Sequence, residues 1–210
     1  MNQALPYTIR PMEPGDVPIV AAIERLSFPT PWPTSSFLYE LSNRTRSFYR
    51  VLLKAEGRGT TRREGRWRRW LRGVVDRPEE SRVIGYVGFR LQSPEAHIST
   101  VAVHPDWREN GLGELLLLTA IEQALELGSS AVSLEVRASN RVAQNLYRKY
   151  GFRFTSVHRG YYRDGEDAWL MEVQIKQETY RARLIRLRQT LEARLGGLKV
   201  DVGQNGGDTL

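Results

Sequence analysis

The sequence predicts a single α/β domain with basic segments added to it. A length of 210 residues suits one domain with additions. With 40% hydrophobic, 10% aromatic and 26% charged residues, the composition is that of an ordinary globular protein, which excludes a fibrous or wholly disordered chain. Strand-like runs alternate along the chain with longer segments whose apolar residues recur at helical spacing.

Two absences narrow the class of protein further. The chain has no cysteine, which excludes disulfides, thiolate metal sites and a catalytic thiol, and which fits a reducing compartment. No apolar run approaches the ~20 residues of a membrane span. The first residues also lack the basic and apolar regions of an export signal. We therefore expect a cytoplasmic protein.

Positive charge is concentrated in two segments. Residues 58–72 hold seven arginines and one glutamate, a net charge of +6, and residues 176–199 have a net charge of +5. Since the whole chain carries +7, the remainder carries −4. An acidic body with basic attachments argues against a nucleic-acid-binding fold built on one basic face.

The first elements are a strand, two helices and a second strand. Residues 7–12 are predicted to form the strand, and Asp16 is expected to cap a helix that the proline-rich run at 28–33 ends. The second helix is predicted to begin at Thr34 or Ser35. A strand at 48–53 follows it.

An arginine-rich insert over residues 56–80 separates that strand from the next, at 81–91. Such an insertion between neighbouring strands costs little, because loop-closure entropy grows slowly with length. Trp67, Trp70 and Leu71 indicate a short helix within it. Two interpretations stay open: a solvated, partly ordered loop, or a contact with a phosphate-rich partner such as ribosomal RNA, made by arginine and stacked tryptophan.

The strand predicted at 96–104 is irregular. Its apolar residues fall on even positions at Ala96 and Ile98 but on odd positions at Val101 and Val103. A slip of one residue in a two-residue period indicates a β-bulge. Because Ala102 lies between the two valines, a doubly buried strand end is the alternative.

The second half of the domain continues the alternation. A helix over 112–127 and a strand over 132–136 are followed by a helix from Asn140, its expected cap, to Tyr150, with Gly151 beyond its end. Strands near 152–162 and 168–175 flank a turn at 163–165.

The C-terminal region, residues 177–197, is predicted to form an amphipathic helix. Apolar residues recur there every three or four positions, at Tyr180, Leu184, Leu187, Leu191 and Leu195. We expect this helix to pack on its own domain or on a second copy, with a membrane surface as the alternative. Residues 198–210 are expected to be a flexible tail.

A glycine-containing turn joins the strand at 96–104 to the helix at 112–127. The N–H groups in the first turn of a helix have no internal partner and carry the positive end of the helix dipole. Gly111 and Gly113 let an anion approach this backbone without a Cβ in the way. The turn is therefore a candidate anion site, and a plain tight turn is the alternative.

The same turn resembles a known motif. Arg108-x-x-Gly111-x-Gly113 is similar to the Q/R-x-x-G-x-G/A acetyl-CoA loop of the GNAT N-acetyltransferases. The strings at 28–33, 134–140, 145–152 and 160–168 resemble the RimI-like branch, whose members acetylate N-terminal alanines of ribosomal proteins. The resemblance covers about residues 7–175. It implies a mixed, mostly antiparallel, twisted sheet of about seven strands flanked by helices, in a domain over residues 1–176.

The resemblance also implies an activity and its residues. Acetyl would pass directly from acetyl-CoA to a protein N-terminal amine, with Glu135 as general base and Tyr147 as general acid. Trp32, Tyr161 and Tyr162 would line the acceptor pocket. The residues implied to contact acetyl-CoA are Val101, Ala102, Val103, Arg108, Glu109, Asn110, Gly111, Leu112, Gly113, Glu114, Asn140 and Tyr147.

These roles agree with the chemistry of the residues. An α-amine has a pKa near 8, and only its neutral form attacks a thioester. Glu135 lies in an apolar strand, where desolvation is expected to raise its pKa; a solvent-facing residue or a pair with Arg137 is the alternative. Tyr147 lies two helical turns after Asn140 on the same face, and a core aromatic is its alternative.

Glu109 and the three histidines are not expected to contact a ligand through their side chains. Relatives often have a basic residue where this loop has Glu109, so we expect Glu109 to point away while the backbone and Arg108 hold the anion. His97, His104 and His158 are scattered along the chain and are interpreted as structural or exposed residues, so no metal is expected.

Three functions stay open from the sequence. The first is the N-terminal acetyltransferase. The second is a related enzyme that acetylates a lysine side chain or a small amine. The third is a ribosome- or RNA-associated binding module that keeps the fold.

Overall fold

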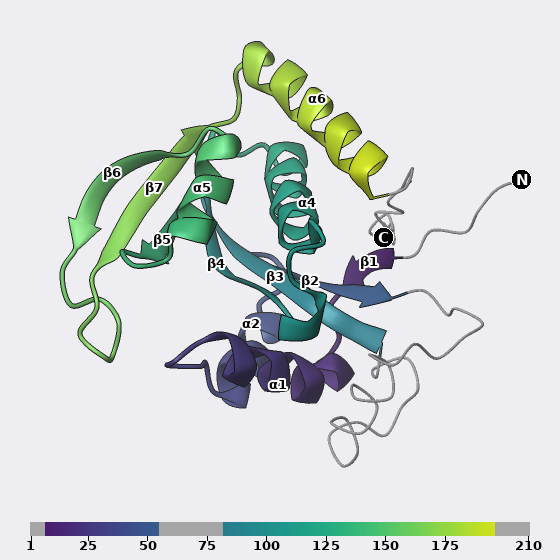
Figure 1. The fold of residues 1–210 in the computed structure, drawn as a ribbon, viewed down its shortest axis with the longest axis vertical. Coiled ribbons are helices and arrows are strands. Elements are labelled where there is room, and N and C mark those ends of the chain that lie inside the picture. Colours follow the sequence, from purple (N-terminus) through teal and green to yellow (C-terminus); the bar gives the residue numbers. More distant parts are fainter. Residues whose placement is uncertain (1–6, 55–81, 196–210) are drawn as a thin grey trace, which may run out of the picture.

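The computed structural model describes residues 7–54 and 82–195, and these form one sheet with helices on both faces (Figure 1). The strands are β1 (Tyr7–Pro11), β2 (Ser47–Lys54), β3 (Val83–Gln92), β4 (Glu95–Val103), β5 (Ala131–Arg137), β6 (Arg153–His158) and β7 (Ala168–Gln174). The helices are α1 (Val17–Ser27), α2 (Thr34–Ser42), α4 (Leu112–Glu126), α5 (Arg141–Lys149) and α6 (Glu178–Arg194), with short 3-10 turns at Pro14–Asp16 and Pro105–Trp107.

The sheet is mixed and mostly antiparallel, as predicted. Its order is β1-β2-β3-β4-β5-β7-β6, and β4 with β5 is the parallel pair among these seven described strands. Helices α1 and α2 lie on one face, where α1 packs on β3 and β4, and α4 packs on the same two strands from the other face (Figure 1). The central strand β3 is therefore buried over most of its length.

A β-bulge interrupts β4, and this confirms the irregularity predicted from the sequence. Ile98 pairs with Phe89 and Thr100 pairs with Gly88, so Ser99 is the additional residue in β4. Bulges bend a strand and increase its twist. The parallel pairing of β4 with β5 ends at Ile98 and Leu134, at the same level. Beyond the bulge the two strands separate.

Most predicted boundaries are confirmed, but the role expected for Asp16 is wrong. Helix α1 does begin after Asp16, yet the Asp16 side chain does not cap it. The carboxylate instead accepts the Glu13 backbone N–H at 2.8 Å and the Arg10 guanidinium at 2.7 and 2.8 Å. A 3-10 turn precedes the helix, so Asp16 stabilises the start of that turn.

The second half of the domain follows its predicted turn chemistry. Asn140 caps α5, because its side-chain oxygen accepts the Ala143 N–H at 3.1 Å. Gly151 follows α5 with a φ of 87°, a left-handed conformation that glycine adopts without strain.

The insert joins two adjacent strands, since β2 and β3 pair with each other in antiparallel register. The helix predicted at 67–71 and the tail predicted at 198–210 lie outside the described residues.

The C-terminal helix packs on its own domain, which is one of the two arrangements expected from the sequence. Helix α6 lies against α4, and it buries Tyr180, Leu184 and Leu191 (Figure 1). Over residues 7–54 and 82–195, no helix combines the length and the apolar character that a bilayer crossing demands.

One buried carboxyl lies beneath the loop between α1 and α2. Glu24 is 2% exposed, accepts the Trp32 backbone N–H at 3.1 Å and accepts the Tyr86 hydroxyl. Burial raises the pKa of Glu24 to about 7, although the Trp32 N–H lowers it. Glu24 thereby ties this loop to the centre of the sheet.

We predict that Glu24 makes the stability of the fold depend on pH. The native state holds the Glu24 proton more tightly than the unfolded chain does, so the contribution is fully present below about pH 4.5 and is lost as the pH rises through about 7. A Glu24→Gln variant has no such proton. The difference in unfolding free energy, wild type minus variant, should fall by up to about 3 kcal/mol over this window, measured by urea denaturation. Parallel curves for the two proteins would contradict this.

Candidate active site

Glu135 lies on β5 just beyond the point where β4 and β5 separate. In the parallel register His97 on β4 lies opposite Ser133, and Glu135 shares the face of Ser133 because it is two residues further along the strand. His97 Nε2 contacts Glu135 Oε2 at 2.9 Å, and His97 Nδ1 lies 3.1 Å from the Ser133 hydroxyl. His158, at the end of β6, approaches Glu135 Oε1 at 4.0 Å.

This environment corrects the expected pKa of Glu135. Burial does raise the pKa, as the apolar strand suggested, but the hydrogen bond and charge of His97 and the charge of His158 outweigh burial. The pKa of Glu135 is therefore lowered, and the group is a carboxylate at neutral pH. Among the described residues, Glu135 does not form the alternative pair with Arg137. The Arg137 guanidinium instead contacts Asp164 and Glu166.

Arg137 connects two loops next to Glu135. Its guanidinium contacts Asp164 at 2.8 Å and Glu166 at 2.6 Å in the loop between β6 and β7, and it donates to the Thr30 hydroxyl at 3.3 Å in the loop between α1 and α2. It also lies 3.9 Å from the centre of the Tyr162 ring. Arg137 therefore fixes both loops around the same opening.

Two of the three predicted acceptor-site aromatics lie beside Glu135. Burial and the Glu135 charge raise the pKa of Tyr161, and the Tyr161 ring packs against His158 at 5.8 Å. Tyr162 packs edge-on against Tyr161 at 5.1 Å and lies within electrostatic range of both Glu135 and Tyr147. The loop between β6 and β7 thus forms an aromatic wall.

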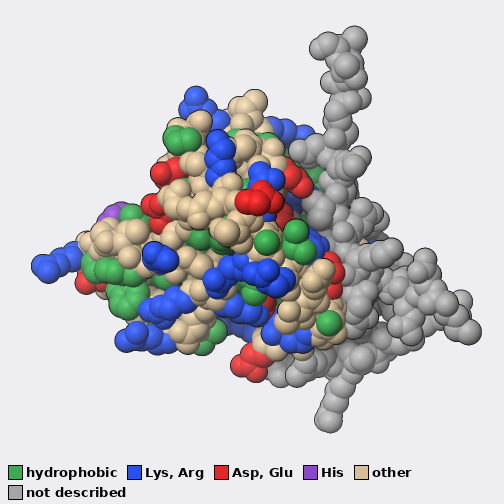
Figure 2. Space-filling view, turned by 90° about the horizontal axis from the view of Figure 1, so that it is seen from above, with side chains coloured by type: hydrophobic (Ala, Val, Ile, Leu, Met, Phe, Trp, Pro, Cys, Tyr) green, Lys and Arg blue, Asp and Glu red, His purple; other side chains and the backbone are tan. Residues whose placement is uncertain are grey.

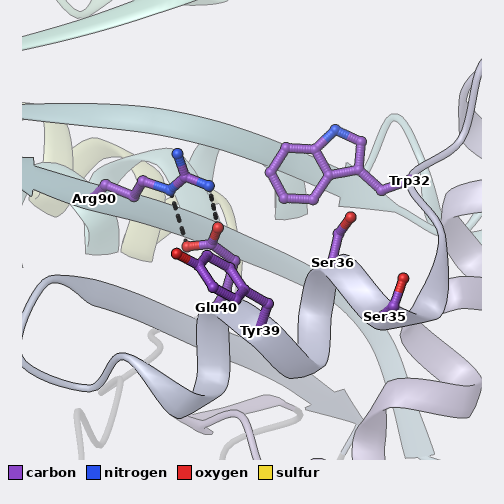
Figure 3. A pocket seen from close by; sticks show the side chains of 6 residues that line it. All are labelled: Trp32, Ser35, Ser36, Tyr39, Glu40 and Arg90. Atoms are coloured by element: carbon purple, nitrogen blue, oxygen red, sulfur yellow. Dashed lines mark hydrogen bonds and ion pairs between the residues drawn. The ribbon is translucent and has the colours of Figure 1, made fainter.

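Trp32 occupies a different place. Its indole lines a pocket of about 510 Å³ together with Ser35, Ser36 and Tyr39 of α2 and the ion pair Glu40–Arg90 (Figure 3). Among residues 7–54 and 82–195, no hydrogen bond, ion pair or ring contact joins Trp32 to Glu135. The structure therefore groups Tyr161 and Tyr162 with Glu135 and places Trp32 at the neighbouring loop, which Thr30 connects to Arg137.

Tyr147 and Asn140 lie on α5, which follows β5 directly. Tyr147 is 7% exposed and packs against Phe152 with ring centres 5.8 Å apart. Burial raises the pKa of Tyr147 to about 12, so the phenol stays protonated at neutral pH. Since the Asn140 oxygen accepts from Ala143, its amide NH₂ group is the part left to donate.

The loop between β4 and α4 has the backbone that the glycine motif predicts. Gly111 precedes α4 with a φ of 78°, and Glu109 has a φ of 65° with an exposed side chain. Arg108 is held by its own chain: Nε donates to the Val103 carbonyl at 3.0 Å and Nη2 donates to the Ser27 hydroxyl at 2.9 Å. The guanidinium thus braces the end of β4 against α1.

The start of α4 suits an anionic group. Within the described residues, the first N–H groups of α4 have no hydrogen-bond partner, as expected at a helix N-terminus. A Cβ on Gly111 would lie 2.8 Å from the Arg194 guanidinium, so a larger residue would fill this space. The pairing of β4 with β5 ends at Ile98 and Leu134, and Glu135 is the next residue of β5.

A family comparison accounts for this arrangement. The family model described as the acetyltransferase (GNAT) family matches residues 19–152. The chain belongs to the GNAT acetyltransferases. The match includes Glu135, Tyr147 and the loop at 108–114, and family membership makes the chain an acetyl-CoA-dependent N-acetyltransferase.

Individual GNAT relatives agree over most of the chain. An N-alpha-acetyltransferase of Sulfurisphaera tokodaii is 31% identical over 178 residues, which cover 79% of this chain and 91% of the relative. The [ribosomal protein bS18]-alanine N-acetyltransferase of Escherichia coli K12 is 29% identical over 171 residues, 80% of this chain and 97% of the relative. The crystal structure of the E. coli ribosomal-protein-S18-alanine N-acetyltransferase superposes with a TM-score of 0.63 at 28% identity, covering 81% of this chain and 95% of that one.

Sequence reasoning missed three residues of this GNAT site. His97 and His158 were interpreted as structural or exposed, and Arg137 entered only as an alternative partner of Glu135. The structure places His97 and His158 in contact with Glu135 and Arg137 between the two neighbouring loops. The sequence held no clear signal for His97, because Ser99 and Thr100 are also polar residues of the same strand. The positions of His158 and Arg137 next to Glu135 could be assigned only from the fold.

We predict that His97 controls the ionisation of Glu135. In a His97→Ala variant the burial of Glu135 is no longer opposed by this hydrogen bond, so the Glu135 pKa should rise. His97→Gln retains a side-chain donor and should produce a smaller rise. NMR titration of labelled glutamate carboxyls measures both shifts. His158→Ala, which removes the neighbour at 4.0 Å but no hydrogen bond, should give a smaller rise than His97→Ala. An unchanged Glu135 pKa in His97→Ala would refute the assignment.

Proposed function

We propose that this GNAT enzyme acetylates the N-terminal α-amine of a protein, and that its acceptor is an N-terminal alanine of a ribosomal protein. One observation carries the proposal: the Glu135 carboxylate lies where β4 and β5 separate, held by His97 and faced by the Tyr161 and Tyr162 wall. The names of the S. tokodaii and E. coli relatives support an α-amine acceptor, and the E. coli name supports the alanine.

The donor would lie along the gap between β4 and β5. The Gly111 turn and the first N–H groups of α4 would hold the diphosphate, as helix N-termini do with anions. The NH₂ group of Asn140 would donate to an amide of the pantetheine arm. The residues proposed for this site are Val101, Ala102, Val103, Arg108, Glu109, Asn110, Gly111, Leu112, Gly113, Glu114, Asn140 and Tyr147, with Arg108 bracing the loop through Val103 and Ser27.

Acetyl-CoA supplies a thioester carbonyl; a C–N bond forms with the amine, the C–S bond breaks, and CoA leaves. An α-amine with a pKa near 8 is partly neutral at physiological pH, so the enzyme does not need a strong base to generate the nucleophile. Glu135, as general base, accepts the proton that the amine loses as the C–N bond forms. Its low pKa keeps it ionised for this role, and His97 is placed to share the proton.

Tyr147 supplies the proton on the leaving-group side. Its phenol is protonated at neutral pH because burial raises its pKa to about 12. It would donate this proton to the departing sulfur and regain it from solvent. Direct transfer of this kind needs no covalent enzyme intermediate, and the chain has no cysteine to form a thioester.

The acceptor would enter between the two loops that Arg137 connects. Tyr161 and Tyr162 on one side and the Trp32 loop on the other would enclose the first residue. The remainder of the chain outside the two basic segments carries −4, which favours the approach of a basic peptide, chiefly through the association rate.

We predict that acceptor choice follows the N-terminal residue. Among peptides that differ only at position one, an alanine start followed by arginine should give the highest kcat/KM. N-terminally blocked copies that retain a lysine, and free polyamines, should be acetylated at least 100-fold more slowly, because they cannot place an α-amine beside Glu135. Mass spectrometry of the products gives both the rate and the position. Faster acetylation of the lysine or the polyamine would replace the proposed function with the corresponding alternative.

We further predict the effect of removing the base. Glu135→Gln keeps the shape and hydrogen bonding of the side chain but cannot accept a proton, so kcat should fall by about 10²–10⁴. Acetyl-CoA binding, measured by calorimetry, should be unchanged. Glu172→Gln, on the neighbouring strand β7, makes the same charge change in the same sheet and serves as the control. Undiminished turnover by Glu135→Gln would remove Glu135 from this role.

A further inference from the structure

The last turn of α6 reaches the phosphate-binding loop proposed above. Helix α6 lies outside residues 19–152, the segment that the family model matches. Its buried residues Tyr180, Leu184 and Leu191 hold it against the rest of the domain. Because α6 and α4 pack together, the C-terminal end of α6 comes to lie at the N-terminal end of α4, beside Gly111 (Figure 1).

Gly111 is shaped for this contact. A Cβ at Gly111 would lie 2.8 Å from Arg194 Nη2 and 3.3 Å from a methyl of Leu191. The Arg194 guanidinium therefore packs directly over the backbone of the turn that precedes α4. Position 111 requires glycine for two reasons, which are its φ of 78° and the close approach of Arg194.

The charge at this point is unusual for the start of a helix. A cation there is opposed by the positive end of the helix dipole, and within the described part of the chain Glu114 is the carboxylate that pairs with it. Glu114 accepts from Arg194 Nη2 at 2.5 Å and from Lys149 Nζ at 2.5 Å, and it also accepts the Tyr150 hydroxyl at 3.0 Å. Two cations against one carboxylate leave a local excess of one positive charge. That excess lies beside N–H groups that already favour an anion.

Arg194 also has unused donors. Its side chain is 53% exposed, and among the described residues only its Nη2 has a hydrogen-bond partner, Glu114. A guanidinium offers five N–H donors in a planar fork that matches phosphate oxygens. Figure 2, which views the molecule from the α6 side, shows Lys and Arg side chains gathered on this face with carboxylates among them.

We propose that Arg194 of the C-terminal helix binds the diphosphate of acetyl-CoA. It supplies a guanidinium from a distant part of the chain to a loop where Glu109 is acidic and where the Arg108 guanidinium is engaged with Val103 and Ser27. Glu114 orients Arg194 toward the Gly111 turn. Helix α6 thus belongs to the donor site. This inference rests on the donor site proposed above.

Binding to CoA and dephospho-CoA tests the proposal, because the two differ only in the 3′-phosphate. Calorimetry on the full chain should show that Arg194→Gln weakens both ligands by the same factor, about tenfold or more, as expected for the loss of a charged hydrogen bond to phosphate. Arg194→Lys keeps the charge and should recover part of the affinity. Turnover with S-acetylpantetheine, which lacks the diphosphate, should not change.

The matched control is Arg186→Gln, which removes an exposed arginine from the same helix at a distance of two turns. It should leave CoA affinity unchanged. The proposal is overturned by unaltered CoA affinity in Arg194→Gln, by a loss confined to CoA, by an equal loss in Arg186→Gln, or by a parallel fall with S-acetylpantetheine. If the wild-type chain binds neither CoA nor dephospho-CoA, the donor site itself fails, which is a separate result.

Discussion

The separation of β4 from β5 is the constraint on which the rest of this structure depends. A sheet with continuous pairing would satisfy its backbone groups internally and leave no room for a ligand. Here the parallel ladder stops at Ile98 and Leu134, at the level of the bulge at Ser99. The two strands continue with different partners, β3 on one side and β7 on the other. The opening is therefore built into the sheet and does not depend on a mobile loop.

Both ends of this opening are defined by groups that the same strands supply. At the β4 end, the chain turns through Gly111 into α4 and exposes the N-terminus of that helix. At the β5 end, Glu135 meets His97 because the parallel register brings position 97 beside positions 133 and 135. A carboxylate held ionised by two imidazoles is a modest base, suited to an α-amine that is already partly neutral and less suited to a lysine amine. The electrostatics of the site and the proposed acceptor are thus consistent.

The outer parts of the chain support this centre through a few charged contacts. Arg137 joins the loop after β6 to the loop after α1, and Glu24 holds the second loop from beneath through the Trp32 N–H. On the opposite face, α6 contributes Arg194 beside Gly111. In each case one side chain connects segments far apart in the sequence and ties a loop to the rest of the domain.

The sequence alone determined the α/β class, the order of the elements, the bulge in β4, the cap at Asn140 and the glycine turn before α4, because apolar periodicity and turn chemistry are local in the chain. Its motifs also led to the correct family. Only the tertiary structure decided that His97 and His158 meet Glu135, that the Glu135 pKa is lowered and not raised, and that Arg194 lies over Gly111. These properties arise from charges and contacts between residues distant in sequence, whose distances are set by strand register and helix packing.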